Sequence, residues 1–270
     1  MFLPIEYKSK KKKVFLENEV RDKIFNHCSN NLKFLLNKRF KWMEKFINKK
    51  NNKIIIELGS GSGCIKKIIK KKNLILTDIV KYKWIDKKID MLKINLGNKY
   101  INKVDIFIIN HALHHCPNPV KSLRLISKYL RPNGLVLINE PETSYFLKLI
   151  QFITSDEGWS YKKNIFKNKK NLFKNNDPWF SNTAIGELLF KNQEKFKKEF
   201  PKFKFLKNEL SEFLIFINSG GVNSNIPKIP LNNFFLNIIN LIDNFLILIF
   251  PSIFALNRSV ILKKIKSSRN

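Results

Sequence analysis

The side chains in this sequence best suited to chemistry are histidines and carboxylates that follow runs of apolar residues. His114 and His115 come shortly after the run 104–109, and Glu140 follows the run 135–139. A histidine of ordinary pKa can remove a proton from a reacting hydroxyl group near neutral pH. We therefore take His115 or His114 as the candidate general base, with Glu140 as the next candidate. The alternative is structural, with the histidine pair capping the next helix or shaping a pocket.

Polar residues end five apolar runs that are spaced like the strands of a parallel sheet. They are Glu57, Asp78, Asp90, Asn110 and Glu140. Each could cap a following helix. The carboxyl ends of parallel strands lie along one edge of a sheet, however, and such sheets bind their ligands there. The five residues together indicate a binding site at that edge.

The stretch KIIIELGSGSGCIKKII (53–69) predicts how a ligand would approach this edge. A buried strand, a glycine-rich turn and a helix let backbone N–H groups come close to a nucleotide-like ligand. The spacing differs from the dinucleotide fingerprint G-x-G-x-x-G, because Cys64 or Lys66 occupies the place of the last glycine. Glu57 would repel a pyrophosphate and could attract a cationic amino-acid group. A purely structural turn is the alternative.

Hydrophobic periodicity places the elements around these residues and predicts an α/β fold. We expect two helices within residues 14–50, a helix over 119–130 and helical structure over 184–200. The expected strands are 54–58, 74–77, 88–91, 104–109, 135–139, 202–206 and 259–263. Strands that alternate with helices favour a mostly parallel sheet. Residues 156–183 are polar and aromatic with little period, which is typical of a long loop over a site.

From about Asn52 to Pro141 the order of these motifs resembles the class I S-adenosylmethionine-dependent methyltransferases, in their small-molecule branch. The segments that carry the resemblance are the glycine run, LTDI (76–79), IDML (89–92), VDIFIINHALHHCPNP (104–119) and LRPNGLVLINEP (130–141). Asn133 departs from the family pattern, which usually has a glycine there. Asn tolerates the same left-handed backbone, so the departure is mild.

The resemblance implies a Rossmann-like fold, with a seven-stranded, mostly parallel sheet sandwiched by helices. N-terminal helices would precede the sheet, and an inserted lid or helical region would precede the last strands. S-adenosylmethionine would be the cofactor, with Asp78 at its ribose, Asp90 at its adenine, and His114 and His115 facing the reacting methyl. The full set implied to bind the cofactor is Glu57, Gly59, Gly61, Gly63, Asp78, Asp90, Asn110 and His111.

Beyond Pro141 the resemblance is to a subgroup often associated with bacterial polysaccharide or cell-surface glycan clusters. It is carried by DPWFSNTAIGELLF (177–190), FINSGG (216–221) and FALNRSVILKK (254–264). The candidate substrate-binding residues are Tyr145, Trp159, Trp179 and Asn182. Aromatic rings often stack on sugar faces or lipid tails, and core packing is the alternative for each.

These expectations divide the chain into four parts. They are an N-terminal helical segment (1–52), a cofactor-binding core (53–145), a substrate lid (146–200) and a C-terminal segment that completes the sheet (201–270).

The net charge of +30 does not by itself indicate a nucleic-acid partner. Residues 1–53, 54–150 and 151–270 each carry ten more Lys and Arg than Asp and Glu, whereas a phosphate-binding surface is usually a patch. Lysine outnumbers arginine 45 to 6, although phosphate recognition tends to enrich arginine. A bias toward A/T-rich codons is the simplest explanation. Attraction to an anionic membrane surface or substrate is the alternative.

Cysteine usage and the first residues bear on the compartment. Cys28, Cys64 and Cys116 form no C-x-x-C pair, which fits a reducing environment. The cysteines and four histidines offer no convincing ligand set, so no metal is expected. The start, MFLPIEYKSKKKK, lacks an apolar stretch of signal-peptide length, and we expect a cytoplasmic protein.

Residues 234–250 are strongly apolar but include Asn237, Asn240, Asp243 and Asn244. They therefore lack the roughly 18–20 consecutive apolar residues of a membrane span. A buried core helix is the first expectation. An interfacial helix that touches anionic lipid at the inner membrane face is the alternative.

The residues and the resemblance together predict a methyltransferase that acts on a small-molecule, glycan or lipid-linked acceptor. One alternative is a methyltransferase acting on RNA or protein, although no arginine-rich patch favours a nucleic-acid partner. The other is a non-catalytic protein of the same fold that is bound peripherally to a membrane.

Overall fold

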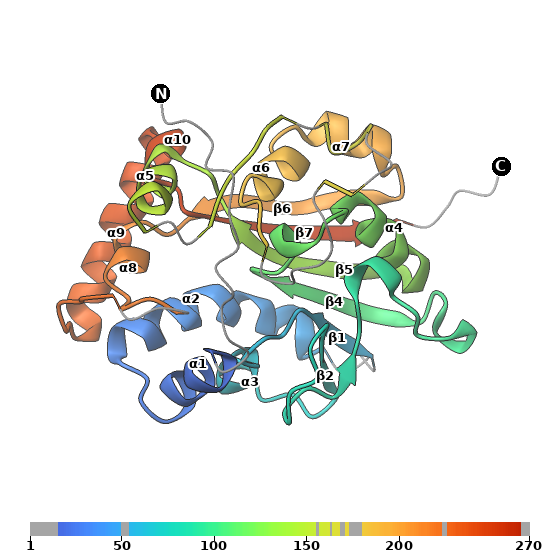
Figure 1. Ribbon diagram of the computed structural model, residues 1–270, viewed down its shortest axis with the longest axis horizontal. Coiled ribbons are helices and arrows are strands. Elements are labelled where there is room, and N and C mark those ends of the chain that lie inside the picture. The colour runs from blue at the N-terminus through green and yellow to red at the C-terminus, as the bar shows by residue number, and fades with distance from the viewer. Residues whose placement is uncertain are drawn as a thin grey trace.

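The computed structural model describes residues 16–49, 54–154, 157–162, 164–167, 171–172, 180–222 and 226–265. A seven-stranded sheet forms the centre of this part, with helices on both of its faces (Figure 1). The strands are β1 (Ile55–Leu58), β2 (Leu74–Asp78), β3 (Lys87–Lys88), β4 (Val104–Asn110), β5 (Leu130–Pro141), β6 (Phe203–Ser211) and β7 (Asn257–Lys264).

The helices divide into those before the sheet, those between its strands and those near its C-terminal strands. They are α1 (Leu16–Phe25), α2 (Asn30–Ile47), α3 (Ile65–Ile68), α4 (Pro119–Tyr129), α5 (Tyr145–Thr154), α6 (Ile185–Phe190), α7 (Gln193–Glu199), α8 (Leu214–Ile217), α9 (Asn233–Ile249) and α10 (Pro251–Phe254). Three short 3-10 turns, η1 (Met91–Lys93), η2 (Asn98–Tyr100) and η3 (Leu113–His115), complete the described elements.

The strand order β3-β2-β1-β4-β5-β7-β6 confirms the predicted Rossmann-like fold. The first five strands in this order are parallel, and β7 runs antiparallel between β5 and β6. Every residue of β1 is buried, as expected for a parallel strand covered on both faces. Because the order reverses between β1 and β4, the loops after these two strands lie side by side at one edge.

Each face of the sheet has its own apolar core. On one face, α1, α2 and α3 pack on β1 and β2, with Phe40 and Met43 of α2 fully buried. On the other face, α4, α6 and α7 pack on β4 and β5, with Leu123 and Ile126 of α4 fully buried. The amphipathic helix expected over 119–130 is thus present as α4, with Pro119 in its first turn.

A third, smaller apolar cluster joins α5, α8, α9 and α10 at the edge where the parallel strands end (Figure 1). Of the 17 residues of α9, Leu236, Asp243 and Ile247 are the buried ones. The first expectation for this segment, a buried core helix, is therefore wrong. Only a narrow stripe of α9 packs against the rest of the protein, and most of its other apolar residues are exposed.

Two further expectations need correction. The strand expected over 88–91 is only Lys87–Lys88, because Asp90 accepts the backbone N–H of Leu92 at 2.7 Å and starts the turn η1. The strand expected over 135–139 is longer, Leu130–Pro141, and Asn133 within it has φ +62°. The helix α5 had no sequence prediction. In the described part of the chain, no helix is long and apolar enough to cross a membrane.

Candidate active site

The glycine turn after β1 is shaped by backbone angles and by a close neighbour. Gly59, Gly61 and Gly63 have φ values of +69°, +48° and +70°, in the left-handed region that favours glycine. A Cβ on Gly59 would lie 2.5 Å from the Cβ of Ala112, in the loop after β4. The turn is therefore packed directly against the neighbouring loop, and Gly59 is what permits this contact.

Glu57 on β1 is a buried acid beside this turn. Among the described residues, no hydrogen-bond partner reaches its Oε2 atom. Burial, with a contribution from the charge of Asp78, raises the pKa of Glu57 to about 8. An orphaned buried carboxyl group of this kind is the expected place for a cationic group of a ligand.

Asp78 and Asp90 approach the same turn from the ends of the neighbouring strands. Asp78 Oδ2 accepts the N–H of Gly61 at 2.8 Å, and its burial raises the pKa of Asp78. Asp90 is half-buried, and Met91 beside it lies with its Cε 3.7 Å from the Cβ position of Gly59. The structure thus brings Glu57, Asp78 and the Asp90 segment around one glycine turn.

Two residues of α1 that the sequence analysis missed cover this turn. The Glu17 carboxylate lies 3.2 Å from the Cβ position of Gly61, and burial together with Asp78 raises the pKa of Glu17 to about 7. Arg21 Nη1 donates to the carbonyl oxygen of Ser62 at 2.8 Å. No motif could have revealed these contacts, because α1 precedes the turn by some forty residues and reads as an ordinary amphipathic helix.

Asn110 and His111 lie at the end of β4. Asn139 donates to Asn110 Oδ1 at 3.2 Å, which fixes that amide against β5. His111 has φ +49°, and in the described chain its buried Nε2 has no hydrogen-bond partner. Burial, with the positive charge of Arg39, lowers the pKa of His111 well below its ordinary value, so its ring is neutral.

Glu140 and His114 form a fully buried pair. Glu140 Oε1 accepts the N–H groups of Ala112 and Leu113, and its Oε2 accepts the N–H of His114 at 3.1 Å. The same Oε2 lies 2.7 Å from His114 Nδ1. Burial lowers the pKa of His114, but the charges of Glu140 and Glu157 outweigh it and raise that pKa to about 10. Glu140 therefore anchors the loop and holds a protonated histidine.

His115 differs from its neighbour although it follows it directly. Its Nδ1 lies 3.1 Å from the carbonyl oxygen of Phe180, so the ring donates there and leaves Nε2 as the free lone pair. Burial and the positive charge of His114 lower the pKa of His115 to about 4. At neutral pH the two adjacent rings therefore carry different charges.

Glu157 joins the histidine pair from the segment after α5, and the sequence analysis missed it. Its Oε1 lies 3.4 Å from His114 Nε2 and 3.8 Å from His115 Nε2. The three ligand atoms lie within 4.8 Å of one another, but His114 would have to give up a proton before it could bind a metal ion, since a charged imidazole has no lone pair. Sequence reasoning found no ligand set because the chain separates Glu157 from the pair by more than forty residues.

The expected substrate-binding residues lie in different environments. Tyr145 is exposed at the first position of α5, whereas Trp159 is buried. Asn182 organises its loop: its Oδ1 accepts the N–H of Ser160 at 2.9 Å, and its own N–H donates to the carbonyl oxygen of His114. Trp179 lies outside the described residues.

The residues at this edge fit a sulfonium nucleoside. The positive-φ glycines leave room for close backbone approach, Asp78 offers a carboxylate for hydroxyl groups, and Glu57 offers a buried, unpartnered Oε2 atom for a cation. The histidine pair lies after the strand adjacent to β1. A cofactor site and a pair of proton-handling groups are therefore neighbours.

Comparison with known proteins agrees with this geometry. Residues 56–138 match the model of a family described as the methyltransferase domain. The match runs from β1 into β5 and includes the glycine turn, Asp78, Asp90 and the histidine pair. This part of the chain is thus similar to a methyltransferase domain, a likeness that supports S-adenosylmethionine as the cofactor. A search of curated proteins finds no match.

Solved structures with a similar arrangement include two methyltransferases. An S-adenosylmethionine-dependent methyltransferase from Archaeoglobus fulgidus is 18% identical, over 86% of this chain and 99% of that chain, with a TM-score of 0.48. A Galdieria sulphuraria protein provisionally assigned as a sarcosine dimethylglycine methyltransferase is 11% identical, over 87% and 85% of the two chains, with a TM-score of 0.46. Likenesses this distant carry no argument about the acceptor.

Proposed function

We propose that this chain transfers a methyl group from S-adenosylmethionine to a small-molecule, glycan or lipid-linked acceptor. The observation that supports this most directly is the juxtaposition of a buried carboxyl group with an unpartnered oxygen, Glu57 Oε2, and a positive-φ glycine turn. The histidine pair follows the adjacent strand. A glycan acceptor, as in the subgroup that the C-terminal segments resemble, is our first choice within this class.

In this proposal the chain's own residues bind and orient both partners. Glu57 faces the cationic end of the cofactor, Asp78 its ribose and the Asp90 segment its adenine, while Asn110 and His111 border the methionine end. The bound cofactor supplies an activated methyl group, so the protein has mainly to align the acceptor and exclude water.

His115 is our candidate base for a hydroxyl acceptor. It is neutral, its Nδ1–H is committed to Phe180, and its Nε2 therefore offers a lone pair. His114 and Glu140, each expected from sequence as catalytic, are in our proposal positioning residues. The charged His114 ring and the Glu140 carboxylate bind each other and fix the loop that carries His115.

Calorimetry with S-adenosylhomocysteine followed by a transfer assay tests the proposal. We expect stoichiometric binding, at least tenfold weaker in Glu57→Gln, and transfer of labelled methyl to glycan, lipid or small-molecule fractions. Transfer to RNA or protein fractions would instead favour that alternative acceptor class. Binding without transfer to any fraction would favour a non-catalytic protein, and absence of binding would overturn the proposal.

The role of His115 has its own test. His115→Ala should lose at least 100-fold in kcat with a hydroxyl acceptor, because it removes the group proposed to take the hydroxyl proton, and should retain cofactor affinity. His27→Ala, at an exposed histidine just after α1, is the control and should keep full activity. Full activity of His115→Ala would remove the base role while leaving methyl transfer intact.

A further inference from the structure

The helix α9 carries three different faces along its length. With 100° between successive residues, Leu236, Asp243 and Ile247 form a stripe that faces the protein. Beside it runs a stripe of four asparagines at helical spacing. The remaining arc, about 140° wide, is apolar. Such a division is typical of a helix that lies along a boundary between two media.

The apolar arc of α9 is exposed in the described structure. Its side chains are Phe234, Phe235, Ile238, Leu241, Ile242, Phe245, Leu248 and Ile249. Leu248 is the most exposed of them, at 80% of its surface. Phe152 and Ile153 of α5 are exposed as well, and α5 and α9 both pack against α10. Exposed apolar area on this scale marks an interaction surface.

No charge interrupts this arc. The one ionisable residue of α9, Asp243, is buried, and its carboxylate accepts the N–H groups of Phe213, Leu214 and Ile215 at 2.8–3.2 Å. The acid is thus turned inward to cap α8 and leaves the outer surface of the helix uncharged.

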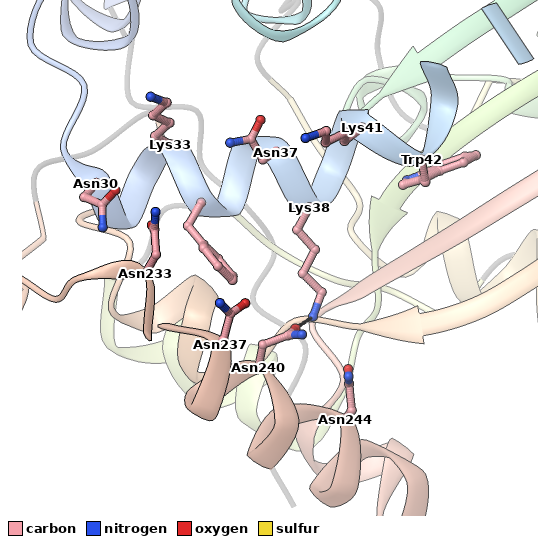
Figure 2. Close-up of a pocket in the computed structure, with 11 residues that line it drawn as sticks. Asn30, Lys33, Asn37, Lys38, Lys41, Trp42, Asn233, Asn237, Asn240 and Asn244 are labelled. Carbon is pink, nitrogen blue, oxygen red and sulfur yellow. Dashed lines mark hydrogen bonds between the residues drawn. The ribbon is translucent and has the colours of Figure 1, made fainter. Parts of the chain in front are cut away.

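A polar cavity of about 510 Å³ lies between α2 and the asparagine stripe of α9. Figure 2 shows the amides of Asn237, Asn240 and Asn244 turned toward α2, with Asn233 nearer the start of the helix. The asparagines lie between the buried stripe and the apolar arc, so the cavity borders the apolar surface. A ligand there would have its polar part in the cavity and its apolar part beside α9.

The opposite wall of this cavity is basic. Lys33, Lys38 and Lys41 of α2 line it, and no acidic side chain is among the described lining residues. Lys38 reaches across to Asn240 Oδ1 (Figure 2). The acids nearest Lys38, Glu212 and Asp243, are both buried and already committed, Glu212 to Arg39 and Asp243 to the start of α8. The free charge in the cavity is therefore positive.

Trp42 also lines the cavity, and its Nε1–H, which is buried, has no acceptor within the described chain. Three lysine side chains and several amides in the lining suit an anionic, oxygen-rich group such as a phosphate ester.

We propose that the α9 surface docks onto an anionic lipid bilayer, with a lipid phosphate in the α2–α9 cavity and the apolar arc among the acyl chains. Charge favours this occupant over a second copy of the chain. Two copies joined through this face would bring their lysine-lined cavities together at a net charge of +30 each, whereas an anionic surface attracts both.

Docking in this way would also orient the candidate active site. The helices α5, α9 and α10 lie at the edge of the sheet where the parallel strands end, which is the edge of the glycine turn and the histidine pair (Figure 1). The inference rests on the proposed function in one respect: membrane docking would favour an acceptor that is carried on a lipid, such as a lipid-linked glycan. Vesicle binding is measured without methyl transfer, so the two can fail separately.

Co-sedimentation of the full chain with vesicles tests the inference. We expect binding to phosphatidylcholine vesicles that contain 30% phosphatidylglycerol and much weaker binding to phosphatidylcholine alone, with the difference shrinking at high salt. Inorganic phosphate at equal ionic strength should compete only weakly, because it lacks acyl chains. Equal binding to both vesicle types, or no binding to either, would overturn the inference.

Matched variants separate the two parts of the surface. Leu248→Glu should weaken vesicle binding at least tenfold, while Ile265→Glu, at an exposed residue beyond β7, should leave it unchanged. Lys33→Gln with Lys41→Gln should lower binding to the anionic vesicles about 20-fold. Lys198→Gln with Lys204→Gln, at exposed lysines on α7 and β6, removes the same charge and should have a markedly smaller effect.

Two results would contradict the proposal even if the wild type sediments. One is loss of binding to the same extent in each variant and its control, which would indicate a diffuse charge effect. The other is a dimer by light scattering that Leu248→Glu converts to a monomer, which would assign the surface to a second copy. Circular dichroism and thermal melts should show all variants folded, because every substituted side chain is largely exposed or lines an open cavity.

Discussion

The glycine turn and the outer face of α9 lie at the same edge of the sheet but are determined in opposite ways. At the turn, each residue is fixed by its neighbours: Gly59 meets Ala112, and Asp78 binds Gly61. On α9, most apolar side chains are exposed, to between 39% and 80% of their surface. A motif therefore specifies a site when the contacts of its residues lie within the fold. An apolar pattern does not tell whether the apolar face of a helix is covered by the rest of the protein or by a binding partner.

The largest expected effect is at Gly59. In Gly59→Ala, the new methyl would meet Ala112 at 2.5 Å in a backbone with φ +69°, so we expect the free energy of unfolding to fall by about 3 kcal/mol or more. Denaturant titration measures this loss, and cofactor binding should be lost as well. Gly97→Ala is the matched control: its φ is +83°, but nothing described lies within 4 Å of the added methyl. It should cost only about 1 kcal/mol, and equal losses would contradict the packing argument.

Glu140 provides the next test of the tightly determined region. Glu140→Gln cannot accept as many hydrogen bonds from the loop and leaves a charged His114 without its partner, so we expect a loss of about 2–4 kcal/mol in unfolding free energy. Glu209→Gln, at an exposed acid on β6, should stay within about 0.5 kcal/mol of wild type. Chemical denaturation compares the two. A loss in Glu140→Gln no greater than that of the control would show that the buried pair does not hold this loop.

Glu57 sharpens the comparison through its pH dependence. Its pKa is raised from 4.5 to about 8 in the fold, so its contribution to stability is fully present below pH 4.5 and is lost as the pH rises to 8. Relative to Glu57→Gln, the wild type should therefore lose unfolding free energy over that range. Denaturation curves between pH 4.5 and 8.5 measure the difference. A difference that does not change with pH would contradict the raised pKa.

The same group should couple proton release to cofactor binding. A cationic ligand group beside Glu57 lowers its pKa, so binding near pH 7 should release protons and strengthen as the pH rises toward 8. Calorimetry in buffers of different ionisation enthalpy counts the protons. Release of the same number by Glu57→Gln would assign them to another group.

The smallest effect is expected on the outer face of α9, and it is informative because it is small. Leu248→Ala should change the free energy of unfolding by no more than about 0.5 kcal/mol, since its side chain touches little. The adjacent Ile247 is 6% exposed, so Ile247→Ala should lower the free energy of unfolding by about 2–4 kcal/mol. Thermal or chemical melts compare these neighbours. Equal losses would mean that the outer face is covered by protein in solution.

Sequence reasoning was sufficient where the chemistry is local. The strands around Glu57, Asp78 and Asn110 follow from β-branched runs with polar ends, and the strand pairing confirms the sheet they form. The strand expected around Asp90 was wrong, because a side-chain hydrogen bond to Leu92 turned the chain earlier than the pattern indicates. Here the strand propensity of the segment is overridden by a side-chain hydrogen bond that starts a turn.

What could not be predicted depends on contacts between distant segments. Glu17 reaches the glycine turn and Glu157 reaches the histidine pair across more than forty residues each, and no periodicity encodes such meetings. The exposure of α9 was also hidden, because a helix with one anchored stripe and a helix buried all round share much of their apolar pattern.

Asp243 has a mechanical consequence for the outer helix. Its carboxylate ties the middle of α9 to three N–H groups at the start of α8, so the helix cannot swing outward without stranding an acid and three donors together. These hydrogen bonds hold α9 at its middle in a fixed position relative to α8. If α9 lies on a membrane surface, its fixed position relative to the sheet also fixes the distance between that surface and the histidine pair. A membrane-bound substrate would have to span that distance to reach the histidines.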